Sequence, residues 1–155
     1  MGYKIIIGEL ILDDSDPDSI RYTVEITEDA TAPIFSGDYA THNTNVRKPK
    51  YSAWADFLHE TDLYELFMDE EVGLMRQHPG VQPIDEEHLH QVNAAYLLRC
   101  AFVDKQPGWE YQNPASATVT ENSTDFDPHL ARLGWLRFWM RWALDNCKSP
   151  SIYNG

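Results

Sequence analysis

The stretch from Pro128 to Asn146 constrains the fold most, because it reads as a helix that is apolar around most of its circumference. Large apolar side chains recur through it: Leu130, Leu133, Trp135, Leu136, Phe138, Trp139, Met140, Trp142 and Leu144. Only a narrow stripe is small or polar: Gly134, Arg137, Arg141 and Asp145. A helix of this kind packs in the middle of a domain. Asp127 is a predicted N-cap, and Pro128 suits the first helical position.

The first third of the chain predicts a sheet for that helix to cross. Tyr3 to Leu12 is rich in β-branched residues and apolar on both faces, which is typical of a strand covered on both sides. Asp13 to Ser19 holds four Asp and a Pro and therefore predicts a turn. Ile20 to Glu28 alternates apolar and polar residues, so the two runs predict an antiparallel hairpin. Ala32 to Thr41 is a candidate further strand.

Helical patterns occupy the middle of the chain. The apolar residues after Tyr51 recur at helical spacing: Trp54, Phe57 and Leu58. Ser52 is a candidate N-cap for them. Asp62, with Glu65 three residues later, is a second candidate cap, so this region predicts two short helices.

A clearer helix follows Asp85, its predicted cap. Glu86 and Glu87 lie in its first turn, where the helix dipole favours anions. Its predicted buried stripe is Leu89, Val92, Tyr96, Cys100 and Val103. The flanking segments, Gln77 to Pro83 and Gln106 to Asp127, predict loops.

Together these patterns predict a single α+β domain, since 155 residues suit one domain of ordinary size. We expect residues 1–45 to be mainly β, 52–103 helical, 104–127 a long loop and 128–147 the C-terminal helix. Three or four helices would pack an antiparallel sheet, with the last helix central. No apolar run approaches the roughly 18 residues of a membrane span. Cys100 and Cys147 belong to no CxxC pair, which favours reduced, packed thiols in a cytoplasmic protein.

The charge of the chain limits its partners. It has 25 Asp plus Glu against 12 Lys plus Arg, a formal net charge of -13. Because neutralising phosphates takes clustered cations, this balance argues against a broad DNA- or RNA-binding face. It permits an acidic surface that docks a basic protein partner.

Tyr39 to Tyr51 is the candidate functional surface, because it concentrates basic and hydrogen-bonding side chains in an acidic chain. Three of the twelve basic residues lie in it: Arg47, Lys48 and Lys50. Guanidinium and ammonium groups supply charge for an anion, and Asn and Thr supply directed hydrogen bonds. The predicted ligand-binding residues are Thr41, His42, Asn43, Arg47 and Lys48, with Arg137 and Arg141 as contributions from the last helix.

Each of these residues also has a structural interpretation. Asn and Thr in a polar loop often bond their own backbone. Arg137 and Arg141 lie one turn apart and are candidates for ion pairs, since Asp145 is four residues after Arg141. Structural ion pairing is the interpretation we favour for these two arginines.

A metal site is a weaker interpretation of Glu86, His88 and His90. Glu86 and His90 are one turn apart, but the spacing is not H-E-x-x-H and no third ligand is near in sequence. A solvated first turn explains all three residues. We expect no metal and no cofactor.

Thr41-His42-Asn43 resembles a segment of small, uncharacterised proteins of phages and actinobacteria. In those proteins a strand ends in Thr-His-Asn, followed by helices and a closing amphipathic helix. The matching parts here are Tyr39 to Asn45, Trp54 to Phe67 and Trp135 to Cys147. The resemblance implies a phage or mobile-element setting, a viral protein in the host cytoplasm, and no established activity.

The leading hypothesis is a non-enzymatic protein that binds a small anionic ligand, for example a nucleotide. One alternative is an acidic interaction or inhibitor module that docks a basic partner. Another is a small hydrolase or transferase with His42 as general base. The sequence leaves all three open.

Overall fold

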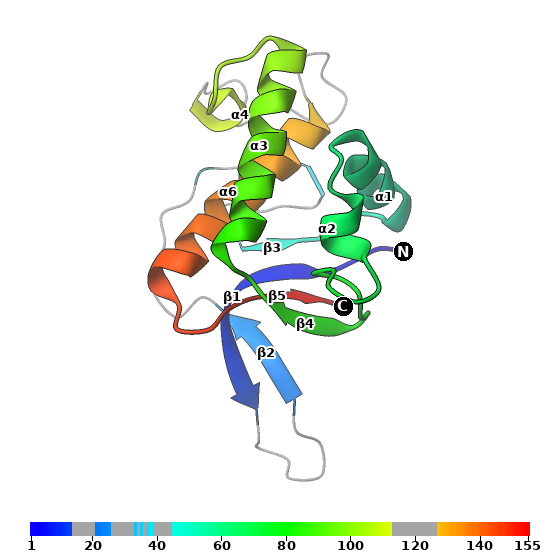
Figure 1. Cartoon of the computed structure of the whole chain (residues 1–155), viewed down its shortest axis with the longest axis vertical. Helices are drawn as coiled ribbons and strands as arrows, with labels where there is room; N and C mark the ends of the chain where they lie inside the picture. The colour runs from blue at the N-terminus through cyan, green and yellow to red at the C-terminus, as the bar shows by residue number, and fades with distance from the viewer. Residues whose placement is uncertain (14–20, 26–32, 34, 36, 39–44, 113–126) are drawn as a thin grey trace.

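The computed structural model describes residues 1–13, 21–25, 33, 35, 37–38, 45–112 and 127–155. In this part of the chain, helices cover one side of an antiparallel sheet (Figure 1), which confirms the predicted α+β class. The sheet order is β2-β1-β5-β4, and β3 also pairs with β1. The strands are β1 (Ile5–Asp13), β2 (Arg21–Glu25), β3 (Val46–Arg47), β4 (Gly80–Pro83) and β5 (Pro150–Asn154).

Strand β1 organises the sheet, because its two halves have different neighbours. Its C-terminal half pairs with β2, from Glu9 opposite Glu25 to Asp13 opposite Arg21, which confirms the predicted hairpin. Its N-terminal half lies between β3 and β5. Figure 1 shows β2 and the end of β1 extending away from the helices.

Three strands were not predicted, β3, β4 and β5, and all of them depend on long-range pairing. β5 lies between β1 and β4, so the last residues of the chain form an interior strand of the sheet. The prediction of a loop from Gln77 to Pro83 is wrong for Gly80–Pro83, which is β4 and pairs with β5. Pro83 is tolerated there because a proline removes a ladder donor that an edge strand does not need.

The helices are α1 (Tyr51–Glu60), α2 (Tyr64–Met68), α3 (Glu86–Val103), α4 (Trp109–Gln112) and α6 (Pro128–Asn146). Two predicted caps are confirmed. Asp85 accepts from the His88 backbone N–H, and Asp127 accepts from the N–H groups of His129 and Leu130. The predicted caps Ser52 and Asp62 are wrong. α1 begins after Lys50 and α2 begins after Leu63, and neither residue makes a side-chain cap bond. α4 lies within the predicted long loop.

Helix α6 is central, as predicted. It packs on β1 and β5 on one side and against α3 on another. Trp135 and Trp139 are almost fully buried, and Ile7 and Ile152 of the sheet belong to the same core. Cys100 is a buried free thiol. None of the helices in the described ranges is long and apolar enough to cross a membrane.

Candidate functional site

The predicted site around Tyr39 to Tyr51 is only partly described. Thr41, His42 and Asn43 lie outside the described residues, whereas Arg47 and Lys48 lie within them. Successive side chains point to opposite faces of a strand. Arg47 pairs with the buried Ile5 and is only 1% exposed, while Lys48 is exposed and lines a separate cleft beside the N-terminus. The two cations therefore do not share one pocket.

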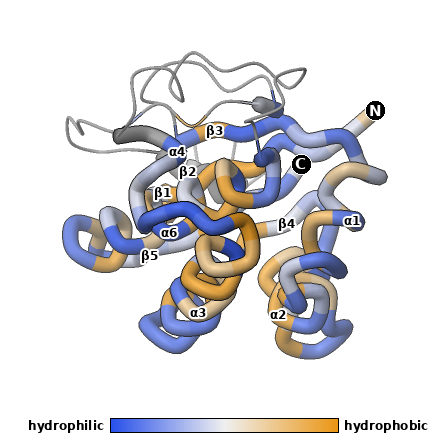
Figure 2. Tube along the Cα trace, turned by 90° about the horizontal axis from the view of Figure 1, so that it is seen from above, coloured by the Kyte–Doolittle hydropathy of each residue, from blue (hydrophilic) through white to orange (hydrophobic). Residues whose placement is uncertain are grey.

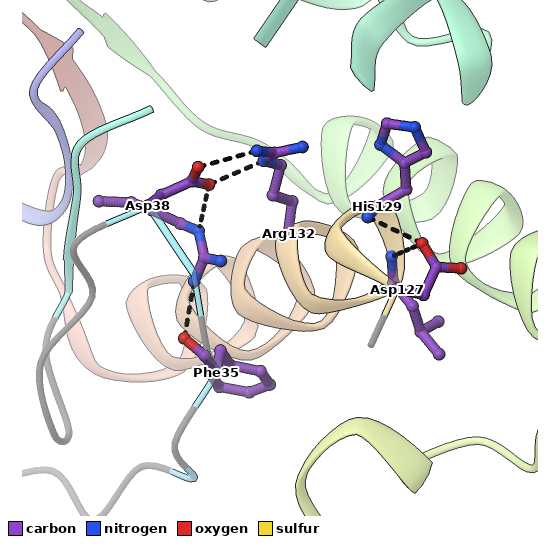
Figure 3. Close-up of polar contacts among 7 residues, drawn as sticks. Phe35, Asp38, Asp127, His129 and Arg132 are labelled. Atoms are coloured by element: carbon purple, nitrogen blue, oxygen red, sulfur yellow. Dashed lines mark hydrogen bonds and ion pairs between the residues drawn. The ribbon is translucent and has the colours of Figure 1, made fainter. Parts of the chain in front are cut away.

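Arg47 belongs to a buried ion cluster, which we call the interior cluster: Arg47, Asp38 and Arg132. Arg47 Nε donates to Asp38 Oδ2 at 2.9 Å. Arg132 donates to both carboxylate oxygens, through Nε at 2.7 Å and Nη2 at 2.8 Å. Figure 3 shows the two bonds from Arg132 of α6 to the Asp38 carboxylate. It also shows the bond to the Phe35 carbonyl oxygen, which accepts from Arg47 Nη1 at 3.0 Å. The cluster ties β3 and α6 to the segment that holds Asp38.

Electrostatics in the interior cluster favour the charged carboxylate. Burial alone would raise the pKa of Asp38, but hydrogen bonds and charges from Arg132 and Arg47 outweigh it and hold the pKa below its ordinary value. Sequence reasoning missed Asp38 and Arg132 because they lie 94 positions apart. The inward orientation of the Arg47 side chain was missed as well, because it depends on the pairing of β3 with β1.

The outward face of α6 brings Arg137 and Arg141 together. A cavity of about 360 Å³ lies along this face, and we call it the α6 groove. Its lining residues are Gly134, Arg137, Phe138, Arg141, Trp142, Asp145 and Asn146. The narrow stripe that the sequence predicted for this helix thus forms most of the groove.

Arg141 is held in a second ion cluster, the surface cluster: Glu86, Arg141 and Asp145. Its guanidinium donates to both oxygens of Glu86, at 3.0 and 2.7 Å. It also donates to Asp145 Oδ1 at 3.1 and 2.8 Å, which confirms the predicted one-turn pair. The carboxylates raise the pKa of Arg141, and the Arg141 hydrogen bonds lower the pKa of Glu86.

The geometry gives Glu86 and His88 protein partners. Glu86 bonds Arg141, and His88 Nδ1 bonds the backbone N–H of Asp85 at 3.0 Å. Within the described ranges, no group of three or more His, Cys, Asp or Glu residues is placed to hold a metal ion.

Arg137 differs from the other arginines of the site. Its guanidinium carbon lies 4.5 Å from the centre of the Tyr96 ring, and the side chain is partly exposed at the groove. Neither a hydrogen bond nor an ion pair joins this guanidinium to any residue of the described chain. A cation on an aromatic face keeps its N–H donors at the ring edge available. Within the described residues, Arg137 therefore lacks the ion pair that the sequence favoured for it, and its N–H donors have no hydrogen-bond acceptor there.

A buried acid lies behind Arg137. Glu110 of α4 is 5% exposed and accepts a hydrogen bond of 2.8 Å from the Tyr96 hydroxyl, which in turn accepts from the Gly108 N–H at 2.6 Å. Burial raises the pKa of Glu110, although Tyr96 and Arg137 partly offset it. Gly134 of α6 allows the Glu110 carboxylate to lie close to the α6 backbone, because a Cβ at position 134 would meet that carboxylate. Sequence reasoning did not single out Glu110.

The chain matches no family model, and it is similar to no curated protein and no solved structure. The resemblance to phage and actinobacterial proteins therefore stays a prediction.

Proposed function

We propose that this is a non-enzymatic binding protein that holds a small anionic ligand in the α6 groove. The observation that carries the proposal is Arg137, a guanidinium at the groove whose donors bond no residue in the part of the chain that the structure describes. A guanidinium presents several N–H donors in a planar fork that matches a carboxylate or phosphate. An anion in the groove would supply the partner that Arg137 lacks.

Charge and shape narrow the ligand class. Arg141 faces two carboxylates, Glu86 and Asp145, so these three side chains carry one net negative charge, and Arg137 brings the sum of the four to zero. That favours a single carboxylate or monophosphate over a triphosphate. Phe138 and Trp142 line the same groove, and its volume of about 360 Å³ suits a small molecule. We expect an anion with a flat apolar part, such as an aromatic carboxylate or a nucleoside monophosphate.

Thermal unfolding across such a panel tests the proposal. A ligand at 100 times its Kd should add about 2.7 kcal/mol to the free energy of unfolding. Arg137→Gln should abolish that shift, because the substitution removes the guanidinium that would bind the anion and keeps much of the side-chain length. Arg76→Gln is the control, since Arg76 is exposed and outside the groove. If no anion shifts the parent, the groove is not a ligand site.

His42→Ala in the same panel tests the site that the sequence predicted. A shift that survives Arg137→Gln but disappears in His42→Ala would move the ligand to the Tyr39–Tyr51 segment. A shift lost only in Arg137→Gln supports the α6 groove. Turnover of a bound ligand that disappears in His42→Ala would favour the hydrolase or transferase alternative.

A second candidate function, docking of a basic protein, rests on the surface of α1, α2 and the turn that follows. This region exposes acidic residues: Asp56, Glu60, Asp62, Glu65, Asp69, Glu70 and Glu71. Binding to a lysine-rich protein should weaken as salt rises, because salt screens exposed charges. Glu65→Lys with Glu70→Lys should weaken it further. Affinity that is independent of both salt and these substitutions would count against the candidate.

A further inference from the structure

A cleft beside the N-terminal end of β1 gathers lysines in an otherwise acidic chain. Its volume is about 380 Å³, and residues 1–4, 48–50 and 155 line it. Three of the chain's five lysines are among them, Lys4, Lys48 and Lys50, and all three are exposed. We call this cavity the lysine cleft. In Figure 2 the N-terminus and β3 lie along the same edge of the molecule.

The antiparallel pairing of β1 with β3 puts two of these lysines opposite each other. Its register places Ile5 opposite Arg47. One step closer to the N-terminus, the same register places Lys4 opposite Lys48. The isolated bridge that Gly2 makes two steps further on keeps this register. Two cations therefore face each other across the paired segments.

The backbone hydrogen bonds identify Lys4 and Lys48 as a pair of the non-hydrogen-bonded kind, in which side chains lie closest. The N–H of Tyr3 donates to the Pro49 carbonyl at 2.9 Å, so the bonded pair is the neighbouring one. The backbone of Lys4 instead exchanges both of its bonds with Gly155, on the β5 side. Opposite Cβ atoms in such a ladder are about 4.5–5.5 Å apart, and like charges at this distance destabilise a sheet.

The three lysines share the face of the sheet that is turned away from the core. Side chains alternate between the two faces of an extended chain. Ile5 and Arg47 are almost fully buried, so Lys4 and Lys48 point to the opposite face. Lys50 follows two residues after Lys48 and therefore lies on the same side, roughly 7 Å further along. The positive charge thus extends along the segment.

Acidic side chains do not offset this charge. Within the described residues, none of the three lysines forms an ion pair with a carboxylate, and no Asp or Glu lines the cleft. If both chain ends are free, the Met1 amino group and the Gly155 carboxylate add one charge of each sign and leave the sum unchanged. Local features that cost stability are expected at functional sites. The facing lysines are such a feature.

We propose that the lysine cleft binds a chain of phosphate groups, as in tripolyphosphate or the triphosphate of a nucleotide. An anion between Lys4 and Lys48 replaces their repulsion with two attractions. Lys50 lies further along the same face, where it meets the next phosphate. Ammonium groups bind phosphate as compact point charges. The lysine cleft shares no lining residue with the α6 groove, whose charged side chains sum to zero, so it is a second site for a more highly charged ligand.

Isothermal titration of the full chain with sodium tripolyphosphate tests the site. We expect saturable binding of one ligand per chain, weakened about tenfold in Kd by Lys4→Gln or by Lys48→Gln, because each removes a charge-assisted hydrogen bond. Lys148→Gln is the matched control: Lys148 is also exposed, lies outside the cleft and changes the net charge equally. Absence of saturable binding by the parent, or an equal loss in the control, overturns the proposal.

Arg137→Gln separates the lysine cleft from the α6 groove. This variant should bind tripolyphosphate as the parent does, because Arg137 is not a residue of the cleft. Affinity that is lost in Arg137→Gln and kept in the lysine variants would assign the anion to the groove and overturn the proposal for the cleft. Adenosine triphosphate then distinguishes the two sources of the phosphates. Affinity equal to that of tripolyphosphate, or a tighter binding that uses the Tyr3 lining, supports the site, whereas binding of the nucleotide alone overturns it.

Charge reversal tests the facing pair in the absence of ligand. Lys4→Glu and Lys48→Glu should each raise the urea midpoint above that of the parent, since each places opposite charges across the pair. The double variant restores like charges and should lose this gain, a coupling that independent sites do not show. All three variants should fail to bind tripolyphosphate. Gains that add in the double variant, or binding that survives a single reversal, overturn the proposal.

Discussion

The molecule holds two clusters of arginine and carboxylate that are alike in bond length and opposite in setting. In the interior cluster, Asp38 bonds Arg47 at 2.9 Å and Arg132 at 2.7 Å. In the surface cluster, Arg141 bonds Glu86 at 2.7 Å and Asp145 at 2.8 Å. The Asp38 side chain is 5% exposed, whereas that of Glu86 is 69% exposed. Two cations share one acid in the first cluster, and two acids share one cation in the second.

The comparison teaches that the surroundings, more than the bond lengths, set what such a cluster contributes. At the surface, water solvates each charge almost as well as its partner does, so the net gain is small. In the interior, each charge has lost its water and depends on the others. Removing one member there takes a bonded partner of opposite charge away from a buried charge, which is the larger effect.

Asp38→Ala should produce the largest loss of stability. It would leave Arg47 and Arg132 buried side by side without their shared carboxylate, and breaking a buried ion pair costs about 3–5 kcal/mol. Urea denaturation of parent and variant measures this difference directly. Asp145→Ala is the matched control at the surface and should lose only a small fraction as much. Equal losses in the two variants would contradict the comparison.

The second-largest effect should come from acid, which weakens the interior cluster. The pKa of Asp38 is held below its ordinary value of 3.8, so the folded state binds this proton less readily than the unfolded state. The stability from Asp38 is therefore fully present above pH 3.8 and is lost as pH falls through the lower pKa of the folded protein. Asp38→Asn cannot titrate, so the stability difference between parent and Asp38→Asn should shrink toward low pH. A difference that is constant with pH would contradict the assignment.

Local patterns explain why much of the fold was predictable. Asp127 and Pro128 specify the start of α6 through interactions within one turn, and the apolar surface of α6 fixes its central position. The hairpin was also predictable from local patterns, because β1 lies in a run of β-branched residues that is apolar on both faces and β2 lies in a run that alternates apolar and polar residues. Asp85 likewise caps α3 through a bond to a residue three positions away.

The parts of the fold and of the site that were not predicted depend on contacts between residues far apart in sequence. β5 has no strong strand pattern, and only its pairing with β1 and β4 makes it an interior strand. Arg47 looked like a solvent-facing cation, but its register opposite Ile5 turns it toward the core. The α6 groove was half predictable: the polar stripe was visible, whereas the partner Glu86 lies 55 residues from Arg141.

Arg141→Gln should have the smallest effect on stability and a separate effect on binding. Because Arg141, Glu86 and Asp145 are all exposed, we expect the unfolding free energy to stay within the scatter of repeat measurements. The substitution nevertheless leaves two carboxylates beside the groove without their cation, so an anion bound to Arg137 should bind more weakly. Isothermal titration with the ligand found in the panel separates the two effects. A large loss of stability would mean that the surface cluster acts like the interior one. Unchanged affinity would mean that the anion lies beyond the reach of Glu86 and Asp145, at the Gly134 end of the groove.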